Sequence, residues 1–264
     1  MATYKASSIV LKSCKLGEAD KIVRLFSIEH GIINAVAKGA CNFKSKFSGR
    51  LELYNVIDSE ISRGRNLDVI SQAEIIEIFQ NISSDFFKFN IAQIISEIIL
   101  KTQSEGSSSV SIFRLVYVVL KEINRCAFND STTLKKILAF FIAKLLKIMG
   151  YVPLFETCSI CSRKLYDKED TYDTHNLRGF AFSIKYGGAI CDDCRRNAGK
   201  LLFVDSRCSN ELINLFILKI EDIVKCNISE KNMKELLYIL ENYFIYHTET
   251  NIESFNYLKK IENI

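Results

Sequence analysis

The sequence SIVLKSCKLGEADKIVRLFSIEHGIINAVAK, residues 8–38, contains three short segments rich in Val, Ile, Leu and Phe, with turn signals at Gly17 and Gly31. Short apolar segments bounded by glycine are typical of β-strands. Two more follow, so five strands are expected in residues 1–80: 8–13, 21–28, 32–38, 51–61 and 67–75. Five short strands in a segment of this size predict a small closed barrel, for which the OB-fold is the best-known example. An SH3-like barrel would give much the same pattern.

Beyond residue 83 the apolar residues recur with a period near 3.6, which predicts amphipathic helices. One apolar stripe covers residues 87–98, and a longer one covers 134–149 and ends at Gly150, as helices commonly do. Further helices are expected at 212–224 and 233–244. The side of the second helix opposite its apolar stripe is expected to carry three lysines: Lys136, Lys144 and Lys147.

Two C-x₂-C pairs, Cys158 with Cys161 and Cys191 with Cys194, lie in a polar segment, 157–200, without sustained periodicity. Two such pairs complete a tetrahedral Cys₄ shell, so we predict a metal site here, with zinc far ahead of iron. Because this segment has few apolar residues, metal binding would supply its folding energy. A closed Cys₄ shell leaves no open position for water, which favours a structural ion over a catalytic one.

The remaining chemistry-bearing residues give little support for an enzyme. His247-Thr248-Glu249 has the H-x-E spacing of zinc deaminases but follows both Cys pairs instead of preceding them. His30 is expected in a turn, and His175 lies in the cysteine segment, where it is a weak alternative ligand. No phosphate-binding glycine motif or nucleophile elbow occurs, so we predict a protein that is not an enzyme. The other cysteines are expected to be small buried hydrophobes: Cys14, Cys41, Cys126, Cys208 and Cys226.

Charge and hydropathy narrow the class of protein. The 264 residues carry 35 Lys and Arg against 31 Asp and Glu, a net charge of +4, which is too near balance to predict nucleic-acid binding by itself. The first twenty residues lack the apolar stretch of a signal peptide, and no run approaches the ~18 residues of a membrane helix. We therefore expect a soluble, intracellular protein with reduced cysteines and no membrane partner.

The charge is unevenly placed, because residues 30–51 contain four basic residues and no acidic one. Phe43 and Phe47 alternate with these cations, and their rings would either stack on nucleobases or pack inward. Cations neutralise phosphates, so this loop is the first candidate for DNA contacts: Lys38, Lys44, Lys46 and Arg50. A second loop and one strand extend the candidate surface: Arg63, Arg65, Lys21 and Arg24.

Several short motifs follow one another along nearly the whole chain: GEADK at 17–21, AKGA at 37–40, GRLE at 49–52, RGRNL at 63–67 and GYVPL at 150–154. The first Cys pair, FS at 182–183, GG at 187–188 and Cys191 come next. In this order and spacing the chain resembles the RecO family of bacterial recombination mediators.

The resemblance implies a multi-domain α+β protein: an OB-fold at 1–80, a mainly helical domain at 81–153 and 205–264, and an inserted Cys₄ zinc module at 154–204. It implies a cytoplasmic, nucleoid-associated protein that binds single- and double-stranded DNA. Such proteins anneal complementary strands coated by single-stranded-DNA-binding protein and work with RecR to load RecA in recombinational repair. A protein-interaction scaffold without a direct DNA role stays as the alternative, and a zinc enzyme as a third class.

Overall fold

The computed structural model describes residues 2–165 and 179–256. The chain separates into two compact units, Met1–Asn129 with Asn256–Ile264, and Asp130–Phe255, and each is described by itself. The four-part domain division expected from the sequence stays a prediction. No helix in the described part of the chain is long and apolar enough to span a membrane.

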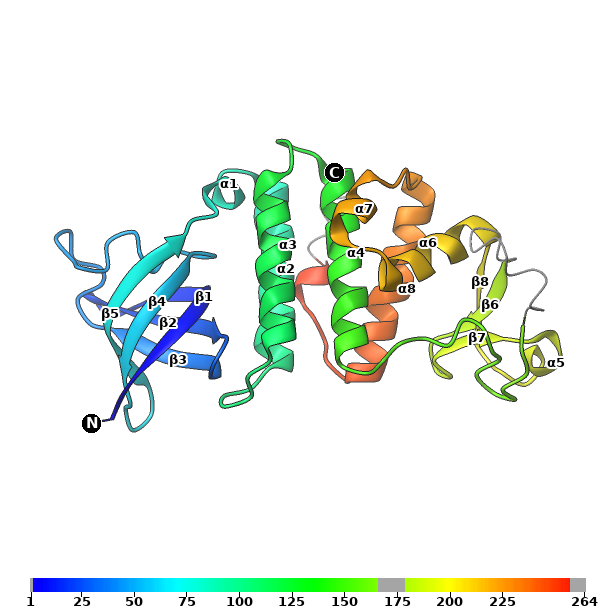
Figure 1. Cartoon of the computed structure of the whole chain (residues 1–264), viewed down its shortest axis with the longest axis horizontal. Helices are drawn as coiled ribbons and strands as arrows, with labels where there is room; N and C mark the ends of the chain where they lie inside the picture. Colours follow the sequence, from blue (N-terminus) through cyan, green and yellow to red (C-terminus); the bar gives the residue numbers. More distant parts are fainter. Residues whose placement is uncertain (1, 166–178, 257–264) are drawn as a thin grey trace. The chain divides into compact units, whose positions relative to one another are not determined.

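The first unit begins with a closed barrel whose strands follow the order β1-β2-β3-β5-β4 (Figure 1). The pair β3–β5 is parallel and every other pair is antiparallel. The predicted five-stranded, OB-like barrel is therefore confirmed. Its strands are β1 Thr3–Leu16, β2 Asp20–Ser27, β3 Gly31–Ala37, β4 Val56–Ser62 and β5 Asp68–Glu77.

Strand β1 closes the barrel because it pairs with two neighbours. Its first half pairs with β4 and its second half pairs with β2. A register shift between Val10 and Lys12 interrupts the pairing with β2. An extra residue of this kind bends a strand and increases its twist, which lets β1 curve from one side of the barrel to the other.

The connector between β3 and β4, residues 38–55, contains turns and no strand or helix (Figure 1). The sequence predicts a strand from residue 51, but β4 begins only at Val56, so that prediction is wrong for 51–55. Ala40, Phe47 and Leu51 of the connector are buried in the same cluster as the inward side chains of the strands. The connector therefore packs its apolar residues into the barrel core.

After the barrel, the described part of the first unit contains the helices α1 Gln80–Ser83, α2 Phe86–Thr102 and α3 Val110–Arg125. Asp85 caps α2, since its side chain accepts hydrogen bonds from the backbone N–H groups of Phe87 and Lys88. It also accepts one from the backbone of Asn129. Burial opposes the charged carboxylate, yet these backbone donors outweigh it and lower the pKa of Asp85.

The second unit is built on α4 Ser131–Ile148, which packs against α6 Ser206–Ile217, α7 Ile220–Lys225 and α8 Glu230–Thr248. The helix expected at 212–224 is two helices, because Leu218 and Lys219 are extended between α6 and α7. The helix expected at 233–244 lies within α8.

The three lysines predicted on the polar side of α4 differ in exposure: Lys147 is exposed and Lys144 is half-buried, so the prediction is wrong only for Lys136. Lys136 is buried, and its ammonium group donates to the carbonyl oxygen of Val224 at 3.2 Å. Lys144 and Lys147 both donate to the carbonyl oxygen of Phe216, near the end of α6, at 2.9 and 3.1 Å. All three therefore donate to backbone carbonyls near the C-terminal ends of the neighbouring helices α6 and α7.

A small sheet inside the second unit carries the cysteine pairs. Its strand order is β7-β6-β8, with β6 Phe180–Ser183, β7 Gly188–Ile190 and β8 Leu202–Val204. The short helix α5, Asp192–Arg195, follows β7 directly. Cys158, Cys191, Ala181, Ile190 and Ala198 form a small buried cluster beside this sheet.

Candidate metal centre and nucleic-acid interface

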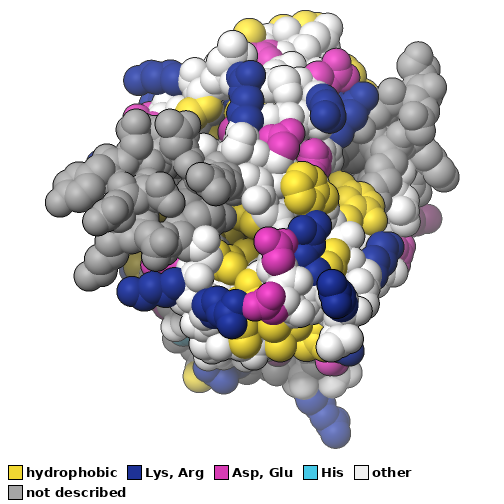
Figure 2. Space-filling view, turned by 90° about the vertical axis from the view of Figure 1, so that its right-hand side faces the viewer, with side chains coloured by type: hydrophobic (Ala, Val, Ile, Leu, Met, Phe, Trp, Pro, Cys, Tyr) yellow, Lys and Arg dark blue, Asp and Glu magenta, His cyan; other side chains and the backbone are white. Residues whose placement is uncertain are grey.

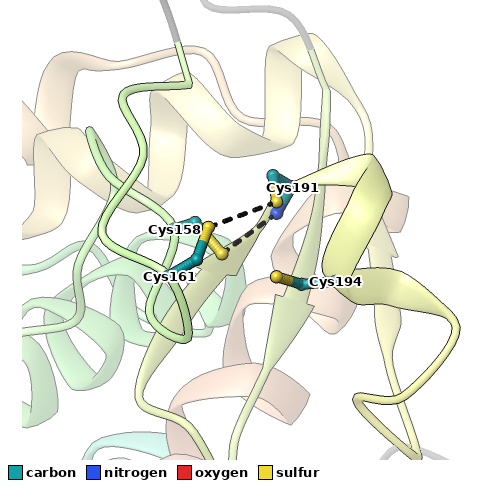
Figure 3. A group of neighbouring side chains, drawn as sticks. All are labelled: Cys158, Cys161, Cys191 and Cys194. Carbon is teal, nitrogen blue, oxygen red and sulfur yellow. Dashed lines mark hydrogen bonds between the residues drawn. The ribbon is translucent and has the colours of Figure 1, made fainter.

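The four paired cysteines converge on one point. Their Sγ atoms all lie within 4.8 Å of one another, and those of Cys161 and Cys191 are 3.7 Å apart. Figure 3 shows the side chains of Cys158 and Cys161 facing those of Cys191 and Cys194. Metal–sulfur bonds of about 2.3 Å in a tetrahedron put sulfur atoms about 3.8 Å apart. The four thiols therefore fit a single tetrahedral metal ion.

Each pair is positioned by a tight turn. The backbone N–H of Cys158 donates to the carbonyl of Arg163, and that of Ser162 donates to the carbonyl of Cys158, both at 2.8 Å. Cys191 follows β7 and is the N-cap of α5, where the N–H of Cys194 donates to the carbonyl of Cys191 at 3.1 Å. Both turns bring the second sulfur of the pair back beside the first.

Gly188 allows the two turns to approach. A Cβ atom at this position would lie 2.3 Å from the carbonyl oxygen of Leu154 and 2.6 Å from Oγ of Ser159. Leu154 pairs with the start of β7, the strand that leads into the second turn. Its N–H donates to the carbonyl of Gly187 at 2.9 Å, and its carbonyl accepts from the N–H of Ala189 at 2.8 Å. Only a residue without a side chain fits between these backbones.

The pKa values of two cysteines in the cluster shift in opposite directions. Burial raises the pKa of Cys158, but the backbone N–H groups of Cys191, Cys161 and Ile160 outweigh it and lower the pKa overall. Hydrogen bonding with the Cys191 thiol is the largest cause that raises the pKa of Cys194. The thiolate form is thus stabilised at Cys158 and disfavoured at Cys194. A divalent cation bound between the four sulfur atoms would allow all four to be charged together.

Three connections gather around the carboxyl end of β3. Lys21 pairs with Ala37, which brings the β1–β2 turn to that end, and Asp68 pairs with Ala35, which brings the β4–β5 loop, residues 63–67. The connector itself leaves β3 there. The N–H of Gly39 donates to the carboxylate of Asp20 at 2.7 Å, which fixes the connector to the β1–β2 turn.

The four cations expected in the connector differ in accessibility. Lys38, Lys44 and Lys46 are exposed, and none of them forms an ion pair within the described residues. The Lys46 ammonium lies 5.2 Å from the centroid of the Phe47 ring. Arg50 is half-buried and donates to the backbone carbonyl of Lys46. Three free ammonium groups therefore face water on this connector.

The other four candidates are less uniform. Arg63 and Arg65 are exposed in the β4–β5 loop, and the Arg63 guanidinium lies 5.6 Å from the centroid of the Tyr4 ring. Lys21 forms an ion pair with Glu52 at 2.9 Å. Arg24 is half-buried on the barrel wall, and its Nε is a buried atom that finds no hydrogen-bond acceptor among the described residues.

The two phenylalanines of the connector have opposite environments. Phe47 is 3% exposed and belongs to the barrel core, whereas Phe43 is 98% exposed. Of the two readings that the sequence leaves open, inward packing therefore holds for Phe47, and Phe43 is left in solvent beside the free lysines.

The face that includes the cysteine module differs from the connector in its charge. Figure 2 shows Lys and Arg side chains interspersed there with Asp and Glu. Two such pairs lie next to the cysteines: Arg163 with Asp193, and Arg195 with Asp192. Residues 38–51 of the barrel connector, by contrast, contain basic residues and no acidic side chain, and Glu52 at their end is paired with Lys21, so this segment is the better candidate for binding a polyanion.

Among the described residues, His30 and His247 lie outside the cysteine cluster, and so do the five unpaired cysteines. His30 lies in a turn, as expected. His247, on α8, shares a hydrogen bond with the carbonyl of Ile184 at 2.8 Å and packs on Tyr243. His175 lies outside the described residues. The expectation that the unpaired cysteines are all buried is wrong, because only Cys208 is; Cys14 is exposed and the others are partly exposed: Cys41, Cys126 and Cys226.

Comparison with known proteins gives one consistent family. Residues 1–79 match the family described as "Recombination protein O N terminal", and residues 83–254 match "Recombination protein O C terminal". The chain is 29% identical over 263 residues to the "DNA repair protein RecO" of Caldanaerobacter subterraneus subsp. tengcongensis, with both chains covered completely. It is 31% identical over 257 residues to the protein of that name from Dehalococcoides mccartyi, covering 89% of this chain and 94% of the relative. It is 35% identical over 193 residues to that of Bifidobacterium adolescentis, covering 72% and 73%. These matches, together with the barrel, the helices and the converging cysteines, show that the chain belongs to the RecO family of DNA repair proteins.

Proposed function

We propose that this protein binds single- and double-stranded DNA, anneals complementary single strands and helps to load a recombinase during recombinational repair. The observation that carries the proposal is the barrel connector, with exposed Lys38, Lys44 and Lys46 and no acidic residue from 38 to 51. The name shared by its relatives, a DNA repair protein, supports the same reading.

The proposed mechanism needs no hydrolysis of ATP. The free ammonium groups neutralise phosphates and release the counterions condensed on them, which binds a strand without regard to sequence. Two strands held on one protein have a raised effective concentration and a reduced mutual repulsion. Both effects accelerate base pairing. We assign the first phosphate contacts to Lys38, Lys44, Lys46 and Arg50.

The remaining candidates have a secondary part in this mechanism. Arg63 and Arg65 extend the cationic surface along the β4–β5 loop. Lys21 contributes less because Glu52 already compensates its charge, and Arg24 contributes less because it is half-buried.

The partners we propose are single-stranded-DNA-binding protein, which coats the strands to be annealed, and RecR, which acts with this protein to load RecA. We place the protein in the bacterial cytoplasm at the nucleoid. These partners are supported by membership of the family.

The decisive experiment measures annealing of two complementary, dye-labelled strands by energy transfer, with and without single-stranded-DNA-binding protein. We expect the protein to accelerate annealing in both conditions, without ATP. A protein that serves only as an interaction scaffold would leave annealing of the bare strands at the rate without protein, and that result would contradict the proposal.

For the cysteine cluster we propose one structural Zn²⁺ held by Cys158, Cys161, Cys191 and Cys194. Four thiolates in a tetrahedron suit zinc, and the closed shell leaves no position for a reacting water. The ion would join the two turns and supply folding energy that the small surrounding core does not.

Metal analysis of the protein purified under reducing conditions tests this assignment. We expect one zinc per chain, and Cys191→Ser is expected to lose the metal and destabilise the module while the barrel stays folded. Cys208→Ser is the control for a buried cysteine outside the cluster, and it should keep its zinc. Absence of stoichiometric metal in the unsubstituted protein would refute the site.

A further inference from the structure

Phe43 is the most exposed large hydrophobic side chain in the described part of the chain, at 98%. The next most exposed is Phe128, at 69%. A ring that is almost wholly in water buries no apolar area, so it contributes nothing to folding through the hydrophobic effect. Its presence is therefore not explained by the stability of the barrel.

The backbone around Phe43 is held in place on both sides. Ala40 and Phe47 are buried in the barrel core. Between them, the N–H of Asn42 donates to the carbonyl of Gly39 at 3.2 Å, and the N–H of Ser45 donates to the carbonyl of Asn42 at 3.0 Å. The N–H of Cys41 donates to the carbonyl of Ala19 in the β1–β2 turn at 2.8 Å. A ligand that contacts Phe43 thus meets a pre-ordered turn and loses little entropy in ordering it.

The charges beside the ring select the kind of ligand. Lys44 follows Phe43 directly, Lys38 and Lys46 lie on the same connector, and none of the three forms an ion pair within the described residues. A polyanion is therefore favoured. Single-stranded nucleic acid combines phosphates for such cations with unstacked bases, each of which offers a π-face to an aromatic ring. In a duplex those faces are already covered by neighbouring base pairs.

We propose that Phe43 stacks on an unpaired nucleobase and makes the connector a subsite selective for single strands over duplex. This inference rests on the proposed DNA binding by the barrel and adds to it a residue that distinguishes the two forms of DNA. The lysines bind the backbone of either form, whereas the ring contributes only where a base is free.

The experiment compares Phe43→Ala with the unsubstituted protein on three ligands: oligo-dT, an oligomer of the same length with abasic sites, and a blunt duplex. Loss of one base–aromatic stack costs about 5-fold or more in affinity for oligo-dT. We expect no loss on the abasic strand or on the duplex. The dependence of affinity on salt should be unchanged, because no charge is removed.

Two further variants serve as controls. Phe43→Trp keeps a π-face and is expected to retain the affinity for oligo-dT. Phe128→Ala removes another exposed ring, from the segment that follows α3, and is expected to change nothing. Phe43→Ala should unfold at the same denaturant concentration as the unsubstituted protein, since the side chain it removes is exposed.

Equal affinities of Phe43→Ala and the unsubstituted protein for oligo-dT would overturn the inference. An equal loss on the abasic strand would overturn it too, since no base is there to stack. If Phe43→Ala impairs annealing only of strands coated by single-stranded-DNA-binding protein, the ring contacts a protein and the inference is wrong. If replacing Lys38, Lys44 and Lys46 by alanine weakens DNA binding and Phe43→Ala does not, the inference on Phe43 is wrong and the proposed function stands. If the unsubstituted protein binds no DNA, both the inference and the proposed function are wrong.

Discussion

Replacing Lys38, Lys44, Lys46 and Arg50 together by alanine is expected to weaken DNA binding and to flatten its dependence on salt. The lysines are exposed and form no ion pairs in the described part of the chain. Their charge is therefore available to phosphates. Arg50 contributes less, because it is half-buried and already donates to the carbonyl of Lys46.

The magnitude follows from counterion release. Each phosphate neutralised on a single strand contributes about 0.7 to the slope of log affinity against log salt. Three free lysines thus account for a slope of about 2. Between about 50 and 200 mM salt, a slope of 2 corresponds to an affinity change of about 16-fold. The unsubstituted protein is expected to lose about 16-fold more affinity over this interval than the alanine variant.

Fluorescence anisotropy of a labelled oligo-dT, titrated at several salt concentrations, measures both slopes. A variant with the three lysines replaced by arginine and Arg50 by lysine keeps the charge and should keep the slope. Chemical denaturation shows whether each variant is folded. An alanine variant that is folded and has the same slope as the unsubstituted protein would remove the connector from the DNA site.

Three other predictions test the packing and the charges. Phe47→Ala is expected to lower the free energy of unfolding by about 3–5 kcal/mol, since it removes a buried ring from the barrel core; denaturation equal to that of Phe43→Ala would contradict this. Gly188→Ala would place a Cβ 2.3 Å from the carbonyl oxygen of Leu154 and so push the two backbones apart. The variant should therefore retain less zinc than the unsubstituted protein on dialysis against a chelator. Equal retention would argue against the close approach of these backbones at the metal site. Burial lowers the pKa of Lys144 from 10.5 to about 8, so the folded protein binds fewer protons than the unfolded chain between these values, and its stability rises with pH across this window. Compared with Lys144→Met, the free energy of unfolding of the unsubstituted protein should rise by roughly 1 kcal/mol from pH 8 to 10.5. This value is smaller than the full shift in pKa would give, because solvent screens the charge at this half-buried site. If the difference in unfolding free energy between the two proteins does not change with pH, this linkage is absent.

The cysteine site and most of the barrel can be predicted from the sequence, because short-range patterns determine them. The C-x₂-C spacing brings two sulfurs together within one turn, whatever surrounds it. Glycines separate most of the barrel strands, so three of the connections lie where the pattern puts them.

The failures occur where tertiary contacts override a local pattern. Leu51 continues an apolar run, but it is drawn into the barrel core from a turn, and β4 starts five residues later. Leu218 and Lys219 break a helix without Gly or Pro to signal it. Lys136 has the spacing of a polar face, yet neighbouring helices cover it and supply a carbonyl oxygen instead of water.

The sequence pattern also does not predict which of Phe43 and Phe47 is buried, because tertiary contacts decide it. Both rings lie among basic residues in a segment without periodicity, so no pattern indicates which one faces the core. Only the packing of the connector against the barrel separates the buried ring from the exposed one.

The most direct test of the account is a photo-cross-link between the protein and a single strand carrying 5-iodouracil, followed by mass spectrometry of the linked peptides. Iodouracil links efficiently to aromatic side chains that stack on it. We expect cross-links within residues 38–50, centred on Phe43. Cross-links confined to the helices of the second unit or to the cysteine module, with none in the connector, would contradict it.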